Sequence, residues 1–117
     1  MNFFSKLLAI LLLFFGEAIA VYAEMAAAKE YSAGGSYAHI FIKAFIAIAL
    51  AGGLLIAGYM TGYKSFKNIW IVTVLSITSI LIMEPLVAYI LFKTLPKRGE
   101  LIGLILGALG MVATFTL

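Results

Sequence analysis

Three glutamates stand inside long apolar stretches of this sequence: Glu17, Glu24 and Glu84. An ionisable side chain in the middle of a transmembrane helix costs roughly 2.5–3.5 kcal/mol on insertion scales, so it usually faces a partner or a water-filled cavity. A carboxyl group held away from water binds its proton more tightly, which suits proton exchange near neutral pH. These residue types therefore favour binding of protons or cations inside a membrane.

The depth of the three carboxylates follows from helix geometry. With a rise of 1.5 Å per residue, Glu17 falls about 2 Å and Glu84 about 5 Å from the centre of its predicted span, and Glu24 falls about 13 Å away, near the interface. Glu17 and Glu24 are seven residues apart and share one helix face. The positions allow a ladder of carboxylates that leads from the midplane to one surface.

A structural alternative exists for each carboxylate, because a hydrogen bond within the bundle would satisfy it without any transport role. No Lys or Arg is predicted at the depth of Glu17 or Glu84. The candidate hydrogen-bond partners are hydroxyl groups on nearby predicted spans: Ser76, Thr78, Ser79 and Tyr22. Two further tyrosines, Tyr59 and Tyr89, lie deep enough to contribute to a cavity wall.

The elements that position these residues follow from composition. Of the 117 residues, 65% are hydrophobic and 11% are charged, against about 25% charged in a typical soluble domain. Four apolar segments each have the ~17 residues needed to cross the hydrocarbon core. We therefore predict an all-α integral membrane protein, with residues 1–117 forming one four-helix transmembrane domain. Its spans are about 3–28, 40–63, 69–92 and 101–117.

The N-terminal segment allows a second interpretation. A basic start, an apolar run and the small residues of Ala18–Ala20 or Val21–Ala23 are typical of a cleaved signal peptide. Cleavage near residue 23 would leave three spans.

Several kinds of chemistry lack the residues they need. The sequence contains no cysteine and a single histidine, His39, at a predicted boundary. It has no phosphate-binding glycine loop, no metal-ligand cluster and no nucleophile with a base. We therefore expect no enzyme activity, no catalytic residue, no metal and no cofactor. The net charge of +3 comes from basic residues at segment ends, which indicates contact with lipid headgroups rather than with nucleic acid.

The last predicted span carries a stripe of small residues: Gly103, Gly107 and Gly110. Small residues at this spacing let another helix approach closely. The stripe is either the seam of a homodimer or a packing face within one chain.

Several motifs resemble a half-module of the drug/metabolite transporter superfamily. They are Gly58–Tyr63 (GYMTGY), Glu84–Tyr89 (EPLVAY) and the spaced glycines of Gly103–Gly110. The four-span size and the carboxylate in span one are similar to the small multidrug resistance branch. That resemblance implies an antiparallel homodimer that exchanges protons for cationic substrates. It places the proton and substrate site at Glu17 and the dimer seam at Gly103 and Gly110.

We therefore expect a small proton-coupled exporter of a small solute, acting as a homodimer among the lipids of a prokaryotic cytoplasmic membrane. Two alternatives stay open: a flippase subunit for a lipid or lipid-linked sugar, and a structural subunit of a membrane or pilus assembly. Orientation is weakly determined, because three basic residues lie on one side and five on the other. They are Lys6, Lys64 and Lys67 against Lys29, Lys43, Lys93, Lys97 and Arg98.

Overall fold

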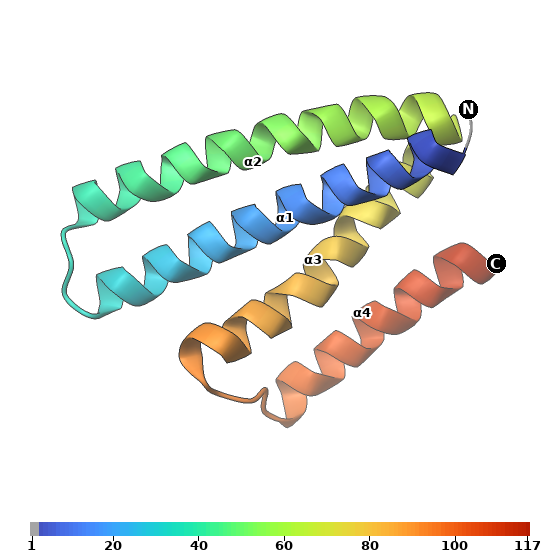
Figure 1. Cartoon of the computed structure of the whole chain (residues 1–117). Helices are drawn as coiled ribbons and strands as arrows, with labels where there is room; N and C mark the ends of the chain where they lie inside the picture. Colours follow the sequence, from blue (N-terminus) through green and yellow to red (C-terminus); the bar gives the residue numbers. More distant parts are fainter. Residues whose placement is uncertain (1–2) are drawn as a thin grey trace.

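The computed structural model describes residues 3–117 as four α-helices with short connections (Figure 1). The helices are α1 (Phe3–Ser32), α2 (Tyr37–Phe66), α3 (Ile69–Phe92) and α4 (Arg98–Thr116). No strand occurs among the described residues. All four helices are long and apolar enough to cross a membrane, which indicates an integral membrane protein. The predicted all-α architecture is confirmed at this level.

The helix boundaries differ from the predicted spans where the chain leaves the hydrocarbon. α3 has the predicted limits, whereas α1 continues to Ser32 and α2 begins at Tyr37. Apolar length predicts only the part of a helix that needs lipid, and helical hydrogen bonds continue until a residue breaks them. Between α1 and α2 that residue is Gly34, with a φ of 98°.

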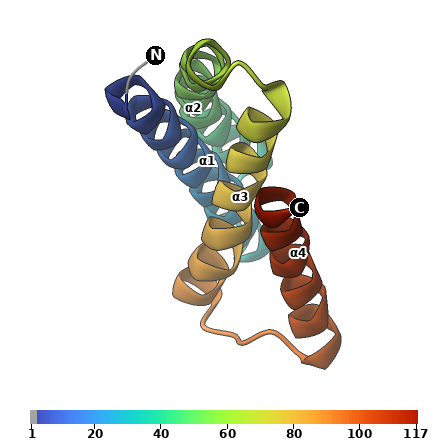
Figure 2. The ribbon, with the colours of Figure 1, turned by 90° about the vertical axis from the view of Figure 1, so that its right-hand side faces the viewer.

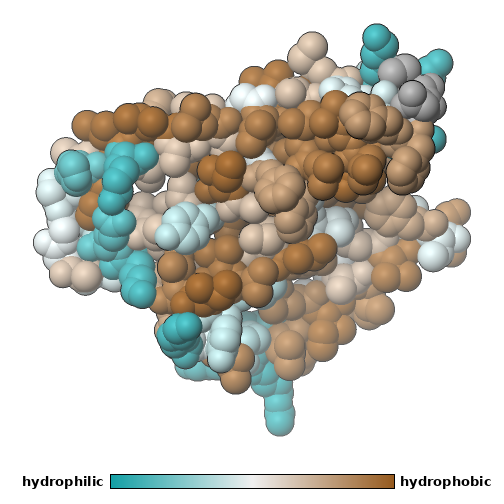
Figure 3. All heavy atoms as spheres, in the orientation of Figure 1, coloured by the Kyte–Doolittle hydropathy of each residue, from teal (hydrophilic) through white to brown (hydrophobic). Residues whose placement is uncertain are grey.

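The four helices form a slab in which α1 lies between α2 and α3 (Figure 1; Figure 2). Its Cα atoms extend over 49 × 35 × 17 Å. Within the described residues, α1 packs along both α2 and α3, whereas α4 packs only on α3. Most of the surface is hydrophobic, as Figure 3 shows for the face seen in Figure 1.

α1 and α2 interlock through two reciprocal contacts between a leucine and a glycine. A Cβ atom at Gly58 would lie 2.9 Å from the Leu13 side chain, and one at Gly16 would lie 2.8 Å from the Leu55 side chain. Leu13 is fully buried. Because lipid tails are as apolar as leucine, helices in a membrane associate mainly through such close packing.

α4 is held more loosely than the other helices. None of its residues is buried. Its packing on α3 includes two close approaches. The Thr78 hydroxyl lies 2.9 Å from the Met111 sulfur, and a Cβ at Gly107 would lie 3.2 Å from Leu81.

Both ends of α3 are marked by a lysine in the left-handed backbone conformation. Lys67, before α3, and Lys93, after it, each have a φ of 57°. Their backbone N–H groups donate to the carbonyls of Tyr63 and Tyr89, at 2.8 and 2.9 Å. This arrangement ends α2 and α3 in the same way, and Asn68 caps the start of α3 with its side-chain oxygen.

The leucine–glycine contacts predict a selective effect of adding one methyl group. Gly58→Ala should destabilise the protein by about 1–3 kcal/mol, because the methyl meets both the side chain and the backbone nitrogen of Leu13. The matched control is Gly53→Ala on the same helix, where a Cβ has no neighbour within 4 Å. Thermal unfolding in detergent measures both. Equal stability of the two variants would contradict the packing described here.

Candidate functional site

The Glu17 carboxylate lies at the middle of α1, at the interface with α3. The Ser76 hydroxyl donates a hydrogen bond of 2.9 Å to Glu17 Oε1. Ser76 is only 5% exposed, and Glu17 is half-buried. The pair therefore joins two spanning helices at a depth where water is scarce.

The other hydroxyl groups considered for Glu17 have different partners. Thr78 contacts Met111 on α4, and Ser79 donates to the Leu75 carbonyl of its own helix at 2.9 Å. Tyr22 lines a hollow between α1 and α2. Ser76 is thus the one of the four candidates that bonds to Glu17.

No basic side chain neutralises the carboxylates near the middle of the helices. Among residues 3–117 the only ion pair joins Lys43 to Glu30, at 2.9 Å, close to the loop between α1 and α2. Glu17 and Glu84 therefore have no Lys or Arg as an ion-pair partner within the described chain. A carboxylate in this situation can accept a proton or a cation.

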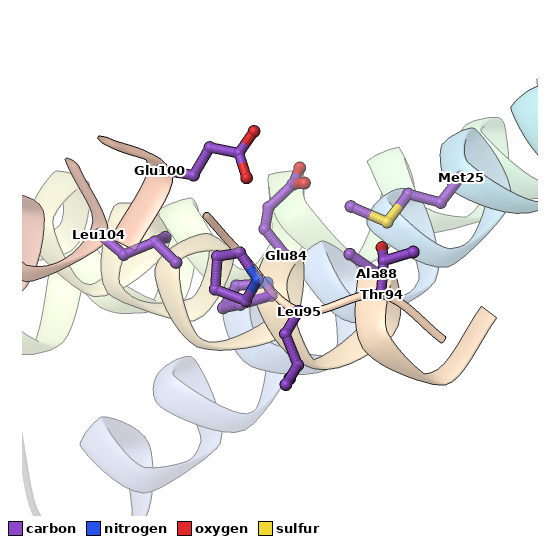
Figure 4. Close-up of a pocket in the computed structure, with 9 residues that line it drawn as sticks. Met25, Glu84, Ala88, Thr94, Leu95, Glu100 and Leu104 are labelled. Atoms are coloured by element: carbon purple, nitrogen blue, oxygen red, sulfur yellow. The ribbon is translucent and has the colours of Figure 1, made fainter. Parts of the chain in front are cut away.

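A cavity of about 340 Å³ is lined by residues of α3, of α4 and of the loop between them, together with Met25 of α1 (Figure 4). Figure 4 shows Glu84 and Glu100 projecting to the same side of this cavity, from α3 and from the first turn of α4. The rest of the wall is mostly apolar. The lining residues besides the two glutamates are Met25, Pro85, Ala88, Thr94, Leu95, Pro96 and Leu104.

Glu24 is a further acidic residue near Glu84. It lies on α1, close enough to Glu84 for the two charges to repel each other. One oxygen of the Glu100 carboxylate already has a hydrogen-bond partner. Its Oε1 accepts a hydrogen bond of 2.7 Å from the backbone N–H of Lys97, and this bond caps the start of α4. Among the described residues, no three His, Cys, Asp or Glu side chains are placed to hold a metal ion.

The three carboxylates predicted to form one ladder therefore lie in two separate regions of the bundle. Glu84 lines the cavity, Glu24 lies close enough to repel its charge without lining the cavity, and Glu17 accepts a hydrogen bond from Ser76. The two tyrosines proposed for the cavity wall do not line the cavity of Figure 4. Tyr59 is half-buried on α2, and Tyr89 is exposed with the Lys93 ammonium 5.9 Å from its ring centre.

The three glycines of the predicted stripe on α4 have different surroundings. Gly107 faces Leu81 within the chain, whereas a Cβ at Gly103 or at Gly110 would have no neighbour within 4 Å. One glycine therefore takes part in packing inside the chain, and the other two leave an open surface.

Glu100 lines the cavity, although the predicted spans leave it in the connection before the last one. α4 begins at Arg98 and includes Glu100. A short connection between antiparallel helices returns the chain to the end of the preceding helix. That rule could have placed Glu100 near Glu84, which lies in the second half of α3.

Searches against protein-family models, curated proteins and solved structures found no match to this chain.

The hydrogen bond between Glu17 and Ser76 can be measured by a double-mutant cycle. We expect Glu17→Ala and Ser76→Ala to show a coupling free energy of about 1 kcal/mol, the usual net size for one hydrogen bond. The control pair is Glu17→Ala with Ser79→Ala, since Ser79 bonds to its own helix. Unfolding free energies in detergent give both values. A larger coupling in the control pair would contradict the assignment.

Proposed function

We propose that this chain is a small secondary transporter that exchanges protons for a small cationic solute. The observation that carries the proposal is the Glu17 carboxylate at the middle of α1, bonded to the Ser76 hydroxyl. A hydroxyl group can donate to an ionised carboxylate and can accept from a protonated one. The contact between α1 and α3 can therefore persist while Glu17 gains and loses a proton. Transporter sites typically lie at this midplane depth.

The cavity at the end of α3 supports the cationic class of solute. Glu84 and Glu100 supply negative charge, and the mostly apolar wall suits the carbon skeleton of an organic cation. Pro85 stands beside Glu84 in the same wall and removes one backbone hydrogen bond from α3. The helix can thus bend at the residue that binds the solute.

The proposal includes a second copy of the chain. A slab 17 Å thick encloses little volume, and α4 has no buried residue. Gly103 and Gly110 leave an open strip on α4 where another helix can approach closely. These two glycines lie almost symmetrically about the centre of α4. An antiparallel copy would therefore place Gly103 of one chain against Gly110 of the other.

Transport by purified protein in liposomes tests the function. With a proton gradient and tetraphenylphosphonium or tetraethylammonium as probes, Glu17→Gln should abolish proton-coupled uptake because amides do not titrate. Glu84→Gln should raise the half-saturation concentration about tenfold, which corresponds to ~1.4 kcal/mol of binding free energy. Ser79→Ala is the control and should transport normally.

Two results would contradict this assignment. Undiminished coupled transport by Glu17→Gln would remove the proton role. Movement of a fluorescent lipid across the bilayer, without any cation transport, would favour a flippase instead.

Disulfide cross-linking in membranes tests the second copy, because the chain has no cysteine of its own. Gly103→Cys and Gly110→Cys copies expressed together should cross-link to each other if the copies are antiparallel. Gly107→Cys should not cross-link, since that position faces Leu81 of its own chain. Cross-linking through Gly107→Cys alone would contradict the proposed seam.

A further inference from the structure

The charged side chains at one end of the bundle, where α1 begins, α2 ends and α3 begins, are all basic among the described residues. They are Lys6 on α1, Lys64 in the last turn of α2 and Lys67 in the connection to α3. The Lys6 ammonium lies 5.4 Å from the centre of the Phe66 ring, so the start of α1 lies beside the end of α2. The three lysines therefore share one end of the molecule, which we call the basic end.

The acidic side chains of the chain all lie far from the basic end. The sequence has five acidic residues, and none of them is on α2. On α1 the first is Glu17, about 16 Å along the helix from Lys6. On α3 the first is Glu84, about 22 Å from the start of that helix. Within residues 3–117, no carboxylate forms an ion pair with a lysine of the basic end, so the positive charge there is uncompensated.

The opposite end has more basic residues, but several of them have partners. Lys43 is paired with Glu30 at 2.9 Å, and the Lys29 ammonium donates to the Leu91 carbonyl near the end of α3 at 2.6 Å. Glu100 adds a further carboxylate in the first turn of α4. A count of basic residues alone favours the opposite end, whereas the balance of positive and negative charge favours the basic end.

The basic end lies at the level of the lipid headgroups. The 24 residues of α3 extend about 36 Å, so the start of this helix reaches the boundary of a hydrocarbon core about 30 Å thick. Trp70 and Tyr63 flank the connection from α2 to α3 and are 73% and 56% exposed. Such rings favour the membrane–water boundary. Figure 3 shows hydrophilic atoms at the upper right, where α2 ends in Figure 1, beside a mainly hydrophobic surface.

We propose that the basic end binds phospholipids with a net negative headgroup in preference to zwitterionic phospholipids. A lysine ammonium can donate to the phosphate of either kind of lipid. A zwitterionic headgroup such as that of phosphatidylethanolamine also carries an ammonium, which meets three lysines and no carboxylate side chain at this end. Like charges repel, so this lipid loses part of what its phosphate gains. The headgroup of phosphatidylglycerol has no positive group and avoids that loss.

The selectivity therefore comes from the lack of acidic side chains near the lysines. It requires no particular arrangement of the lysines in depth. The basic end is also separate from Glu17 and from the cavity of Figure 4, so this inference does not depend on the transport proposal.

Native mass spectrometry of the full chain tests the site. The protein is released from an equimolar mixture of phosphatidylglycerol and phosphatidylethanolamine that have identical acyl chains. Wild type should retain more phosphatidylglycerol. Lys64→Gln should lower the ratio of the two retained lipids about fivefold, the effect of roughly one lysine near an anionic membrane surface. Lys6→Gln together with Lys64→Gln should lower the ratio further.

The matched control removes the same charge at the opposite end. Lys93→Gln together with Lys97→Gln should lower the lipid ratio less than the double variant of the basic end does. An equal or larger fall in this control would overturn the proposal, because the total charge of the protein would then decide the preference.

Two further substitutions at the exposed Lys64 separate charge from folding. Lys64→Arg keeps the charge and should keep the preference for phosphatidylglycerol. Lys64→Glu supplies the carboxylate that this end lacks, so it should shift retention toward phosphatidylethanolamine. A preference for phosphatidylglycerol that is unchanged in Lys64→Glu would equally overturn the proposal.

Discussion

The contact of Leu13 with Gly58, and of Leu55 with Gly16, determines how this bundle is built. In lipid there is little hydrophobic gain from bringing two apolar helices together, so stability depends on how closely their surfaces fit. Glycine removes the Cβ that would keep the backbones apart. Glu17 follows Gly16 and is turned about 100° from it around the helix. The same packing that joins α1 to α2 therefore directs the carboxylate toward α3, where the Ser76 hydroxyl donates a hydrogen bond to it.

Packing becomes looser from α1 toward α4, and the polar groups follow this gradient. The hydrogen bond of Glu17 lies in the tightly packed part, between α1 and α3. The acidic cavity lies in the loosely packed part, where α4 meets only α3. A proton requires little space and a solute requires a cavity. The division between a packed carboxylate and an open acidic cavity matches these two needs.

The sequence was sufficient to predict long apolar helices, because four segments have the length to cross the hydrocarbon core and there are too few polar residues to cover them in water. It also restricted the partner of Glu17 to four hydroxyl groups. It did not identify Ser76 among them, since that choice depends on the rotation and crossing of α1 and α3. Glu100 was missed because the start of α4 is fixed by a polar cap rather than by hydropathy. The transport activity and the dimer stay predictions.

The two lysines that bracket α3 have a consequence for the bilayer that surrounds the protein. Both adopt a left-handed conformation that glycine would adopt more easily, so each helix end carries a charge at some conformational cost. Between them, 24 residues of α3 extend about 36 Å, whereas the 30 residues of α1 and of α2 extend about 45 Å. A hydrocarbon core of about 30 Å accommodates α3 with its amines at the two surfaces, but α1 and α2 must tilt or protrude. α3 therefore fits the hydrocarbon core more closely than α1 or α2 does, and a thicker bilayer would draw the charged ends of α3 inward before it covered those of α1 and α2.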